Sequence, residues 1–392
     1  MKTYDVNAGV DVGKSFHHIY AIGHSGEVLA DRRINQCEQE LTDTFTELLS
    51  FGSVLVTVDQ PSNIGSLTIA CARRAGCDVA YLPGLAMRRA AGIMPGEAKT
   101  DRRDAFVIAM TASSLPGALR RVPDRSGIKA DLAALASYDD DCRCDMTREI
   151  NRLRAHLLEV SPLFERTLGD SVTSSFALKL LNRFGGPWGM HKAGKAAVIR
   201  WAKKQKRVPR KLFDRLIEAA FSKQEMPAGA CLREELAIPA CASRILELIA
   251  VRKDIERRVI ELLSDDPGYI ALITIPGVGV RTAMTFLLCV DIAAFPSVDH
   301  LASYAGLAPR THQSGTSIKG ESAARTGNKA LKNALYQSAF AALRSDPHAK
   351  WYYDKKRAEG KTHNAALIAL ARRRLKIMYA IVRDLRPYQT VA

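Results

Sequence analysis

Ala8-Gly9-Val10-Asp11-Val12-Gly13 is an apolar stretch with a single carboxylate near its centre. Its small and β-branched residues predict a strand over residues 5–13. Aspartate is depleted in strands, and a carboxylate inside a sheet is costly to desolvate unless its charge is compensated. Asp11 is therefore a candidate functional residue on the first strand of a sheet.

The residues that follow predict a mixed α/β sheet over about the first 115 positions. Three strands in a meander, followed by alternating helices and strands, are typical of this class. Further strands are expected near 16–23, 27–34, 53–59 and 77–82, and helices near 38–50, 64–75 and 101–113. Pro116-Gly117 and Pro123 mark the end of this region.

The remainder of the chain is predicted to be helical. Apolar residues at helical spacing in 127–172 and 232–264 predict two long helices that pair as an antiparallel coil. Shorter helices are expected near 327–344, 348–358 and 363–385. These patterns divide the chain into an α/β domain (1–125), a helical coiled-coil region (126–265) and a mainly helical C-terminal domain (266–392).

The chain is strongly basic. Its 392 residues include 57 Lys and Arg against 41 Asp and Glu, which gives a net charge of +16. Such an excess predicts a polyanionic partner, most commonly a nucleic acid, and no apolar run favours a membrane instead. Eight cysteines without paired CxxC spacing, and an N-terminus without a signal-peptide core, predict a cytoplasmic protein with reduced thiols.

Three further acids accompany Asp11. Asp59 ends the strand predicted at 53–59, and Asp101 and Asp104 lie on one face at the start of a helix. Carboxylates from separate elements can converge at one edge of a sheet, where their oxygens suit a hard cation such as Mg²⁺ or Mn²⁺. In a basic protein, this predicts metal-assisted chemistry on a phosphodiester.

Each of these three acids also has a structural interpretation. Asp101 is a good N-cap, and Asp104 would compensate the helix dipole in the first turn. Asp59 could begin a turn with Gln60-Pro61.

The C-terminal part contains two glycine-rich motifs. Pro276-Gly277-Val278-Gly279 before a helix resembles a helix-hairpin-helix turn, in which the backbone N–H groups of Gly277 and Gly279 bind phosphate; a plain interhelical turn is the alternative. A glycine-bounded loop is expected over 306–320. From composition alone, Ser314 in that loop is an ordinary loop serine, since no partner base is evident.

Two basic runs are candidate phosphate-binding segments. The denser covers residues 200–211, and the other is Arg372-Arg373-Arg374-Leu375-Lys376. Either run could be a solvated helix face, but the charge excess favours phosphate binding by at least one. The residues proposed from the first run are Lys203, Lys204, Lys206 and Arg207.

These motifs together resemble a family of bacterial insertion-sequence transposases with a DEDD tetrad, the bridge-RNA-guided recombinases, which are also similar to pilin-gene invertases. The matching stretches are Gly9-Val10-Asp11-Val12-Gly13-Lys14, Lys99-Thr100-Asp101-Arg102-Arg103-Asp104-Ala105, Ile275-Pro276-Gly277-Val278-Gly279, Tyr304-Ala305-Gly306-Leu307-Ala308-Pro309, Gln313-Ser314-Gly315 and Gly327-Asn328-Lys329. One position departs from the family, whose second acid is usually glutamate where this chain has Asp59.

The resemblance implies a fold and a reaction. The first domain would be RNase H-like (RuvC-like), and a coiled-coil insertion and a C-terminal transposase domain would follow. Asp11, Asp59, Asp101 and Asp104 would be catalytic metal ligands. Ser314 would attack DNA and form a covalent 5′-phosphoserine intermediate.

The resemblance also implies the partners. A structured noncoding guide RNA would pair with donor and target DNA, and homodimers would assemble into a tetramer in the bacterial cytoplasm, at the nucleoid when active. Residues expected to contact nucleic acid near the serine are Gly315, Lys319, Arg325 and Lys329. A metal-dependent nuclease or junction resolvase that uses water, and a non-enzymatic nucleic-acid-binding scaffold, are the alternatives.

Overall fold

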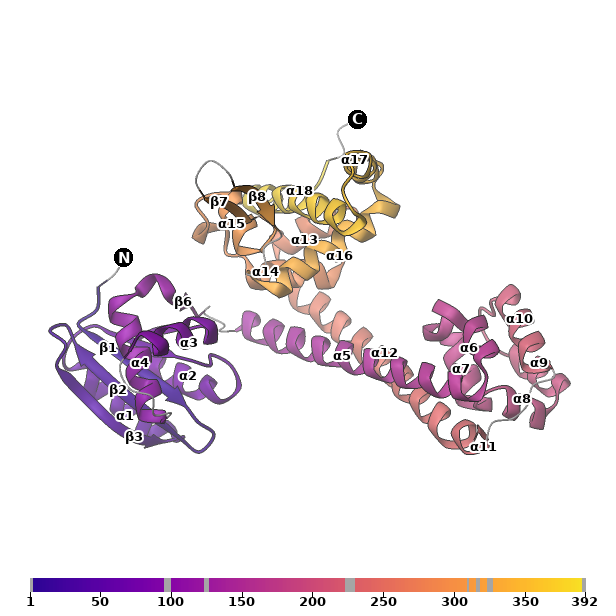
Figure 1. Cartoon of the computed structure of the whole chain (residues 1–392), viewed down its shortest axis with the longest axis horizontal. Helices are drawn as coiled ribbons and strands as arrows, with labels where there is room; N and C mark the ends of the chain where they lie inside the picture. Colours follow the sequence, from indigo (N-terminus) through magenta and orange to yellow (C-terminus); the bar gives the residue numbers. More distant parts are fainter. Residues whose placement is uncertain are drawn as a thin grey trace. The chain divides into compact units, whose positions relative to one another are not determined.

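The computed structural model describes residues 3–94, 100–122, 127–222, 230–308, 310–314, 318–322 and 327–389. Two compact units make up the chain, Met1–Asp124 and Arg125–Ala392 (Figure 1). The further division of the second unit at residue 265 stays a prediction.

The first unit is a mixed sheet with helices, as predicted. Its strands are β1 (Val6–Val12), β2 (Phe16–Gly23), β3 (Val28–Asn35), β4 (Val54–Val58), β5 (Asp78–Tyr81) and β6 (Arg120–Arg121). The order is β3-β2-β1-β4-β5-β6; β1, β2 and β3 are antiparallel neighbours, whereas β1, β4 and β5 run parallel. This arrangement agrees with the RNase H-like fold that was expected.

The helices of this unit are α1 (Glu38–Leu49), α2 (Ser66–Ala75), α3 (Gly84–Ile93) and α4 (Asp101–Ser114). Helix α3 and the short strand β6 were not predicted. Pro83 is the N-cap of α3, and the alanine-rich residues after it favour a helix.

The alternation of β1 separates two faces of the sheet. Val6, Ala8, Val10 and Val12 pack in one core with residues of α1 and α2, such as Phe45. Gly9, between Ala8 and Val10 in sequence, points to the other face of the sheet and lies against α4. Helix α4 also packs against β2. The sheet is therefore covered by α1 and α2 on one face and by α4 on the other.

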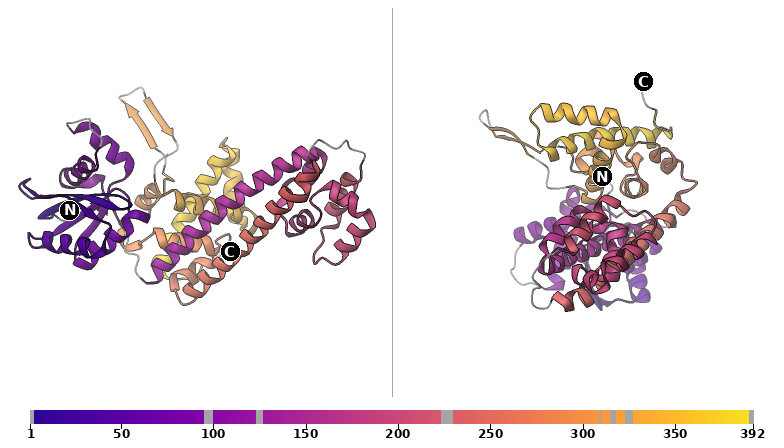
Figure 2. Two further views of the ribbon diagram at one scale, coloured as in Figure 1. Left: turned by 90° about the horizontal axis from the view of Figure 1, so that it is seen from below. Right: turned by 90° about the vertical axis from the view of Figure 1, so that its right-hand side faces the viewer.

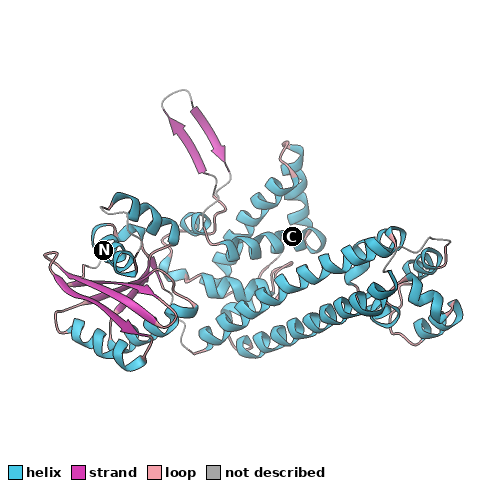
Figure 3. Cartoon of the chain, turned by 60° about the horizontal axis from the view of Figure 1, so that its bottom comes forward, coloured by secondary structure: helices cyan, strands magenta, loops and turns pink. Residues whose placement is uncertain are grey.

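Where the structure describes the second unit, its regular elements are helices and one β-hairpin (Figure 3). Its helices are α5 (Ile128–Val160), α6 (Pro162–Leu168), α7 (Ser175–Phe184), α8 (Pro187–Ala193), α9 (Lys195–Lys203), α10 (Arg210–Ala220), α11 (Ala230–Leu232), α12 (Ile238–Leu263), α13 (Pro267–Ile273), α14 (Val280–Cys289), α15 (Val298–Tyr304), α16 (Lys329–Ser345), α17 (Pro347–Ala358) and α18 (His363–Asp384). A π-helical turn, Arg233–Ala237, leads into α12.

Helices α5 and α12 pair along their lengths, as predicted (Figure 2). The start of α5 and the end of α12 share a core with α13–α18, in which Leu132 and Val259 are buried. The opposite ends share a second core with α6, α7, α9 and α10, in which Leu157 and Ile245 are buried. The two helices are therefore antiparallel and join two separate hydrophobic cores.

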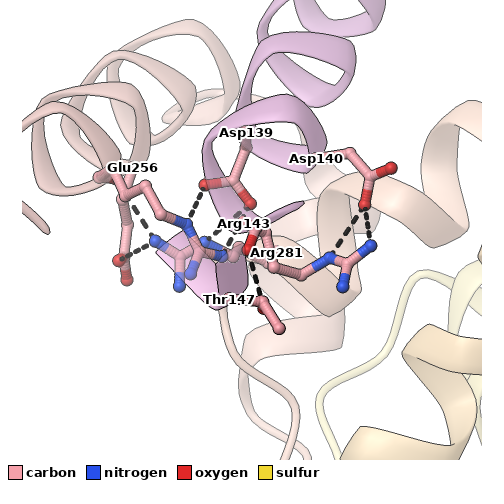
Figure 4. A network of polar contacts seen from close by, with 7 residues as sticks. Asp139, Asp140, Arg143, Thr147, Glu256 and Arg281 are labelled. Carbon is pink, nitrogen blue, oxygen red and sulfur yellow. Dashed lines mark hydrogen bonds and ion pairs between the residues drawn. The ribbon is translucent and has the colours of Figure 1, made fainter. Parts of the chain in front are cut away.

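A buried charge network fixes α14 and α12 to α5 (Figure 4). Asp139 is 7% exposed and accepts hydrogen bonds from the Arg252 guanidinium at 2.8 and 3.0 Å. Arg281 of α14 lies 3.2 Å from the same carboxylate and 3.6 Å from Glu256. The neighbouring Asp140–Arg143 pair is exposed, so Asp139 is the acid whose loss would leave a buried cation unpaired.

The segment expected as a loop over 306–320 contains a hairpin instead. Strands β7 (Arg310–Ser314) and β8 (Ile318–Ser322) pair antiparallel and extend from the helices of their unit (Figures 2 and 3). Glycine and hydroxyl residues suggested a loop, but they also border tight hairpins, and pairing satisfies the backbone groups that a loop leaves open. Within the described ranges, no helix is both long and apolar enough to cross a membrane.

Candidate active site

Asp11 and Asp59 come from adjacent parallel strands. Val10 of β1 is paired with Val58 of β4, so Asp11 and Asp59 are the next residues along each strand. The backbone N–H of Val12 donates to Asp59 Oδ1 at 3.4 Å. Both carboxylates are partly buried. The sheet register therefore places these two acids side by side at one edge, as predicted.

Gly9 allows α4 to lie directly on β1. A Cβ atom built on Gly9 would collide with the backbone of Ala105 and Ala109. Ala105 follows the first turn of α4, so this close contact holds that turn, with Asp101 and Asp104, over the strand that contains Asp11. Sequence reasoning missed this role, although a glycine inside a strand is itself a sign of close backbone approach.

Asp101 does not cap its helix. Thr100 is the N-cap, and its side chain accepts a hydrogen bond from the Arg103 backbone N–H at 3.2 Å. The capping interpretation of Asp101 is therefore wrong, and its carboxylate is exposed. Asp104 is half-buried in the same turn and has no ion pair among the described side chains.

A second contact, not predicted, fixes the start of α4. Arg102 donates through Nε to Asp31 Oδ2 of β3 at 2.7 Å, and His18 of β2 lies 2.9 Å from Asp31 Oδ1. Arg102 stabilises the ionised form of Asp31, which lowers the pKa of that carboxyl group. The residue adjacent to Asp101 is therefore attached to β3, at an acid that β2 also holds through His18.

Charge repulsion is concentrated on Asp11. Burial, followed by the negative charges of Asp59, Asp104 and Asp101, raises its pKa to about 7. Burial also raises the pKa of Asp59, against backbone N–H groups of Val12, Asp59 and Gln60 that lower it. The charges of the other three acids therefore all act on Asp11, and no described cation forms an ion pair with any of the four.

The acids supply the right donors for a divalent cation. Oxygen-only donors with an uncompensated negative charge suit a hard cation such as Mg²⁺. Among the described residues, however, no three carboxylate, thiol or imidazole groups lie close enough to share one ion. Ligation would therefore require the acidic side chains to rotate toward one another, which the repulsion evident at Asp11 opposes until a cation is present.

Replacing Gly9 by Ala should displace the helix that carries Asp101 and Asp104 and so disrupt the site. The methyl group forces α4 away from β1, and overpacking of this kind costs about 1–3 kcal/mol. We expect a lower melting temperature and a much lower rate of any reaction that needs the four acids. Gly92→Ala is the matched control, because a Cβ at Gly92 meets nothing within 4 Å and alanine favours the α3 helix. Equal melting temperatures for the two variants would contradict this role of Gly9.

The candidate nucleophile is at the end of a strand in the other unit. Ser314 is the last residue of β7 and pairs with Ile318 of β8, where Lys319 follows. Gly315 and Arg325 lie outside the described residues. Lys329 is exposed and begins α16.

The glycines of the 276–279 motif have different surroundings. Gly277 has a φ of 78°, and a Cβ there would lie 2.7 Å from the backbone N of Ala342 in α16. Gly279 has open space around it and precedes α14. Gly277 is therefore required for helix packing whether or not it also binds phosphate.

The C-terminal arginine run is not a uniform basic face. Arg374 is 2% exposed and donates to Ser338 Oγ at 2.9 Å and to the Pro276 carbonyl at 2.5 Å. Burial lowers its pKa. This run was a candidate phosphate-binding segment or a solvated face, but Arg374 is neither: it is buried and attaches the 276–279 turn to α16 and α18.

The basic run at 200–211 is exposed and uncompensated. Lys203, Lys204, Lys206 and Arg207 are all exposed, and none pairs with a carboxylate among the described residues. By contrast, arginines on the long helices are paired, for example Arg148 with Asp145 at 2.9 Å and Arg258 with Asp254 at 3.0 Å. The cations of 200–211 therefore lack the carboxylate partners that these arginines of the long helices have.

Two family models match the sequence. A model described as transposase matches residues 8–162, which include the four acids. A model described as the transposase IS116/IS110/IS902 family matches residues 270–354, which include Ser314 and the 276–279 turn.

Full-length relatives are similar over almost the whole chain. The insertion element IS110 uncharacterized 43.6 kDa protein of Streptomyces coelicolor is 42% identical over 379 residues, covering 96% of this chain and 93% of that protein. The insertion element IS900 uncharacterized 42 kDa protein of Mycobacterium paratuberculosis is 32% identical over 383 residues, covering 96% and 95%.

Two partial matches cover less of the chain. A pilin gene-inverting protein of Moraxella bovis is 42% identical over 120 residues, 30% of this chain and 37% of that protein. A solved structure of T. thermophilus RuvC with a Holliday junction substrate covers 30% of this chain and 99% of that one, at 16% identity. Its TM-score of 0.23 is too low to support an argument about this chain.

Proposed function

The chain belongs to the IS116/IS110/IS902 family of transposases, and we propose that it is an RNA-guided recombinase that cuts and rejoins DNA through a serine nucleophile. Transposases of this family act on DNA strands. The observation that supports the chemistry best is the group of four acids, in which burial and, after it, the neighbouring negative charges raise the pKa of Asp11 to about 7. Such a strong perturbation is typical of a functional site.

The acids and the serine have separate tasks in this proposal. Asp11, Asp59, Asp101 and Asp104 would hold Mg²⁺, or Mn²⁺ in its place, which when bound supplies positive charge for the reacting phosphate. Asp59 is one methylene shorter than the glutamate usual in the family. Ser314 Oγ forms a bond to phosphorus while the P–O3′ bond breaks, so the 3′ oxygen leaves and the 5′ phosphate stays on the serine. Rejoining is the same exchange with a new 3′ hydroxyl.

We propose that the acids of one subunit work with Ser314 of another. The four acids are in the first unit and Ser314 is in the second, so a shared site fits the division of the chain. Homodimers would then assemble into a tetramer around donor and target DNA. We place the protein in the bacterial cytoplasm, at the nucleoid when it is active.

We also propose that a structured noncoding RNA selects the DNA. Base pairing between the RNA and the DNA would read the sequence, while the protein binds backbone and shape. Lys319, Arg325, Lys329 and the backbone of Gly315 would contact nucleic acid near the serine. The backbone N–H groups of Gly277 and Gly279 would bind phosphate at their own turn. The charge of +16 suits a protein that holds RNA and DNA together.

RNA guidance is tested by changing the RNA alone. The purified full-length protein, with RNA transcribed from its own element, is given donor and target DNA in Mg²⁺. Altering the target-pairing nucleotides should move the product to the target that matches them, and a scrambled RNA should give no product. Equal recombination without RNA, or at the original target after the change, would exclude guidance.

The basic run should bind phosphates. Replacing Lys203, Lys204, Lys206 and Arg207 by Ala should weaken nucleic-acid binding. Affinity falls as salt concentration rises, and each lost phosphate contact should make the slope of log affinity against log salt concentration shallower by about 0.7–0.9. The measurement is affinity against salt concentration.

The matched control replaces four exposed arginines of the long helices that already have carboxylate partners. These are Arg143, Arg148, Arg257 and Arg258. The control should leave the slope unchanged. A wild-type slope in the first variant would show that the run is only a solvated face.

A further inference from the structure

Two aromatic side chains of helix α17 lie beside cations, on a face that is shared with α18. Lys355 Nζ lies 5.5 Å from the centroid of the Trp351 ring, and Lys356 Nζ lies 5.5 Å from the centroid of the Tyr352 ring. The Arg373 guanidinium of α18 lies 4.9 Å from the centroid of the Tyr352 ring. We call these five residues the α17–α18 face, and none of them is assigned to strand cleavage.

Helical spacing makes this face continuous. Residues three and four positions apart lie beside each other on a helix, so Lys355 is next to both Trp351 and Tyr352. Helix α17 packs against α18 (Figure 1), from which Arg373 reaches the Tyr352 ring. Tyr352 also packs against the core that includes α13–α18, which fixes its ring. The cations of the face are therefore gathered around two neighbouring rings.

Two of these cations keep their charge available for a partner. Lys355 and Arg373 are exposed, and neither forms an ion pair with a carboxylate among the described residues. Lys356, by contrast, pairs with Glu359 at 2.6 Å. An aromatic ring attracts a cation and orients it but leaves its positive charge in place. Lys355 and Arg373 are therefore oriented in advance and can still bind an anion.

Trp351 adds an aromatic surface that the fold does not cover. Its side chain is 60% exposed, although Lys355 lies beside it, and it is not among the residues that pack against the core of this region. Aromatic side chains contribute a large apolar area to the complexes that cover them, and tryptophan is enriched among the residues that dominate binding. The surface of Trp351 is therefore suited to contact with a partner.

The charge of the face selects the partner. A second copy of this chain would bring the same cations and a net charge of +16, so two such faces would repel each other. A nucleic acid brings phosphates for Lys355 and Arg373 and, where it is unpaired, bases that can cover an aromatic ring. Exposed aromatic rings next to cations are the combination by which proteins bind single strands. Bases in a duplex are already stacked on one another, so a duplex would offer this face only its backbone.

We propose that the α17–α18 face binds an unpaired stretch of nucleic acid, with phosphates on Lys355 and Arg373 and a base against Trp351. This inference rests on the proposed function only in that nucleic acid is the partner. It also divides the C-terminal arginine run. Arg373 binds phosphate, whereas Arg372 pairs with an acid of α15 at 3.2 Å and Arg374 is buried.

The two cations are tested with the full-length protein and short labelled strands of one sequence. Affinity for single-stranded RNA, single-stranded DNA and duplex DNA is measured by fluorescence anisotropy at several salt concentrations, and the tighter of the two single strands identifies the strand that is bound. Replacing both Lys355 and Arg373 by Gln should weaken single-strand binding. The slope of log affinity against log salt concentration should become shallower by about 0.7 for each lost contact.

The matched control for the cations replaces both Arg143 and Arg148 by Gln. Each of these exposed arginines of α5 already has its own carboxylate partner, Asp140 for the first and Asp145 for the second. The control should keep the wild-type slope. A wild-type slope in the variant that lacks the two cations of the α17–α18 face would overturn the proposal.

Trp351 is tested by two substitutions. Trp351→Ala should weaken single-strand binding about 10-fold but leave duplex binding unchanged, because only an unpaired base can cover the ring, and Trp351→Phe should retain most of the affinity. The melting temperature should stay the same, since the side chain is exposed. Phe51→Ala is the control, because Phe51 is a 51% exposed aromatic residue of the first unit. Wild-type single-strand affinity in Trp351→Ala, or an equal loss for single strands and duplex, would overturn the proposal.

Sedimentation of the same variants tests a second copy of the chain as the occupant. A changed oligomeric state in Trp351→Ala, with single-strand affinity at the wild-type level, would make the face a protein interface and overturn the proposal. Asp11→Asn protein should bind the single strands like wild type, so lost recombination in that variant does not bear on this inference. Unchanged single-strand binding in the Trp351 and cation variants would overturn this inference and leave the recombinase proposal standing.

Discussion

Asp11→Asn and Asp104→Asn proteins should lose strand exchange, by about 10²–10³-fold or more, while their fold and nucleic-acid binding stay close to wild type. Each change removes one negative charge from a group of acids that has no balancing cation among the described residues. The measurement is recombination at saturating Mg²⁺. Asp43→Asn is the control, because Asp43 is an exposed acid on α1. Wild-type recombination in both variants would exclude a metal role.

Stability gives a second readout that does not depend on activity. An Asp11 pKa of about 7 in the folded protein exceeds the ordinary value of about 3.9 in the unfolded chain. The folded state therefore binds more protons between about pH 4 and 7, and its stability falls as the pH rises through that window. Asp11→Asn should flatten this dependence and be the more stable protein at pH 8 without divalent ions.

Added Mg²⁺ should reverse this difference and make the wild type the more stable of the two proteins at pH 8. It should raise the melting temperature of the wild type at pH 8 but that of Asp11→Asn much less, because binding to the folded state alone is stabilising. The Mg²⁺ effect should weaken below about pH 7, where protons compete for Asp11. An equal Mg²⁺ shift in both proteins would show that the ion binds elsewhere.

The sequence allowed the sheet and the two strand-borne acids to be predicted for a clear physical reason. Asp11 lies near the end of β1 and Asp59 directly follows β4, and the parallel pairing of these two apolar strands brings both acids to one edge. The role of Gly9 could not be predicted, because a strand glycine does not reveal which backbone approaches it. Arg102 likewise acts through Asp31, a residue 71 positions away.

Other differences between the sequence-based predictions and the structure come from packing between elements that are distant in sequence. Successive residues in a helix point about 100° apart, so a run of three arginines on α18 cannot all face solvent. Arg374 is the buried one, which hydropathy alone does not identify. The hairpin at 310–322 was expected as a loop, because its polar residues have no apolar face that would indicate a strand.

Ser314→Ala should remove both strand exchange and any covalent protein–DNA product, by at least about 10³-fold. The change deletes the oxygen that bonds to phosphorus and leaves the pairing of β7 with β8 intact, since that pairing uses the backbone. Ser317→Ala is the matched control, a serine three positions along the sequence, and it should keep the covalent product. The product is trapped on a nicked suicide substrate, and the linked peptide is mapped by mass spectrometry.

This experiment also separates a serine recombinase from a hydrolytic nuclease. A serine hydroxyl is a poor nucleophile at neutral pH and needs help to lose its proton. If water were the nucleophile instead, the acids of the first unit would suffice, and Ser314→Ala would still cut DNA without forming an adduct. Retained cleavage would therefore favour the nuclease, and an adduct on Ser317 would identify a different nucleophile. Loss of cleavage and adduct together, with DNA binding unchanged, is the result that assigns the attack to Ser314.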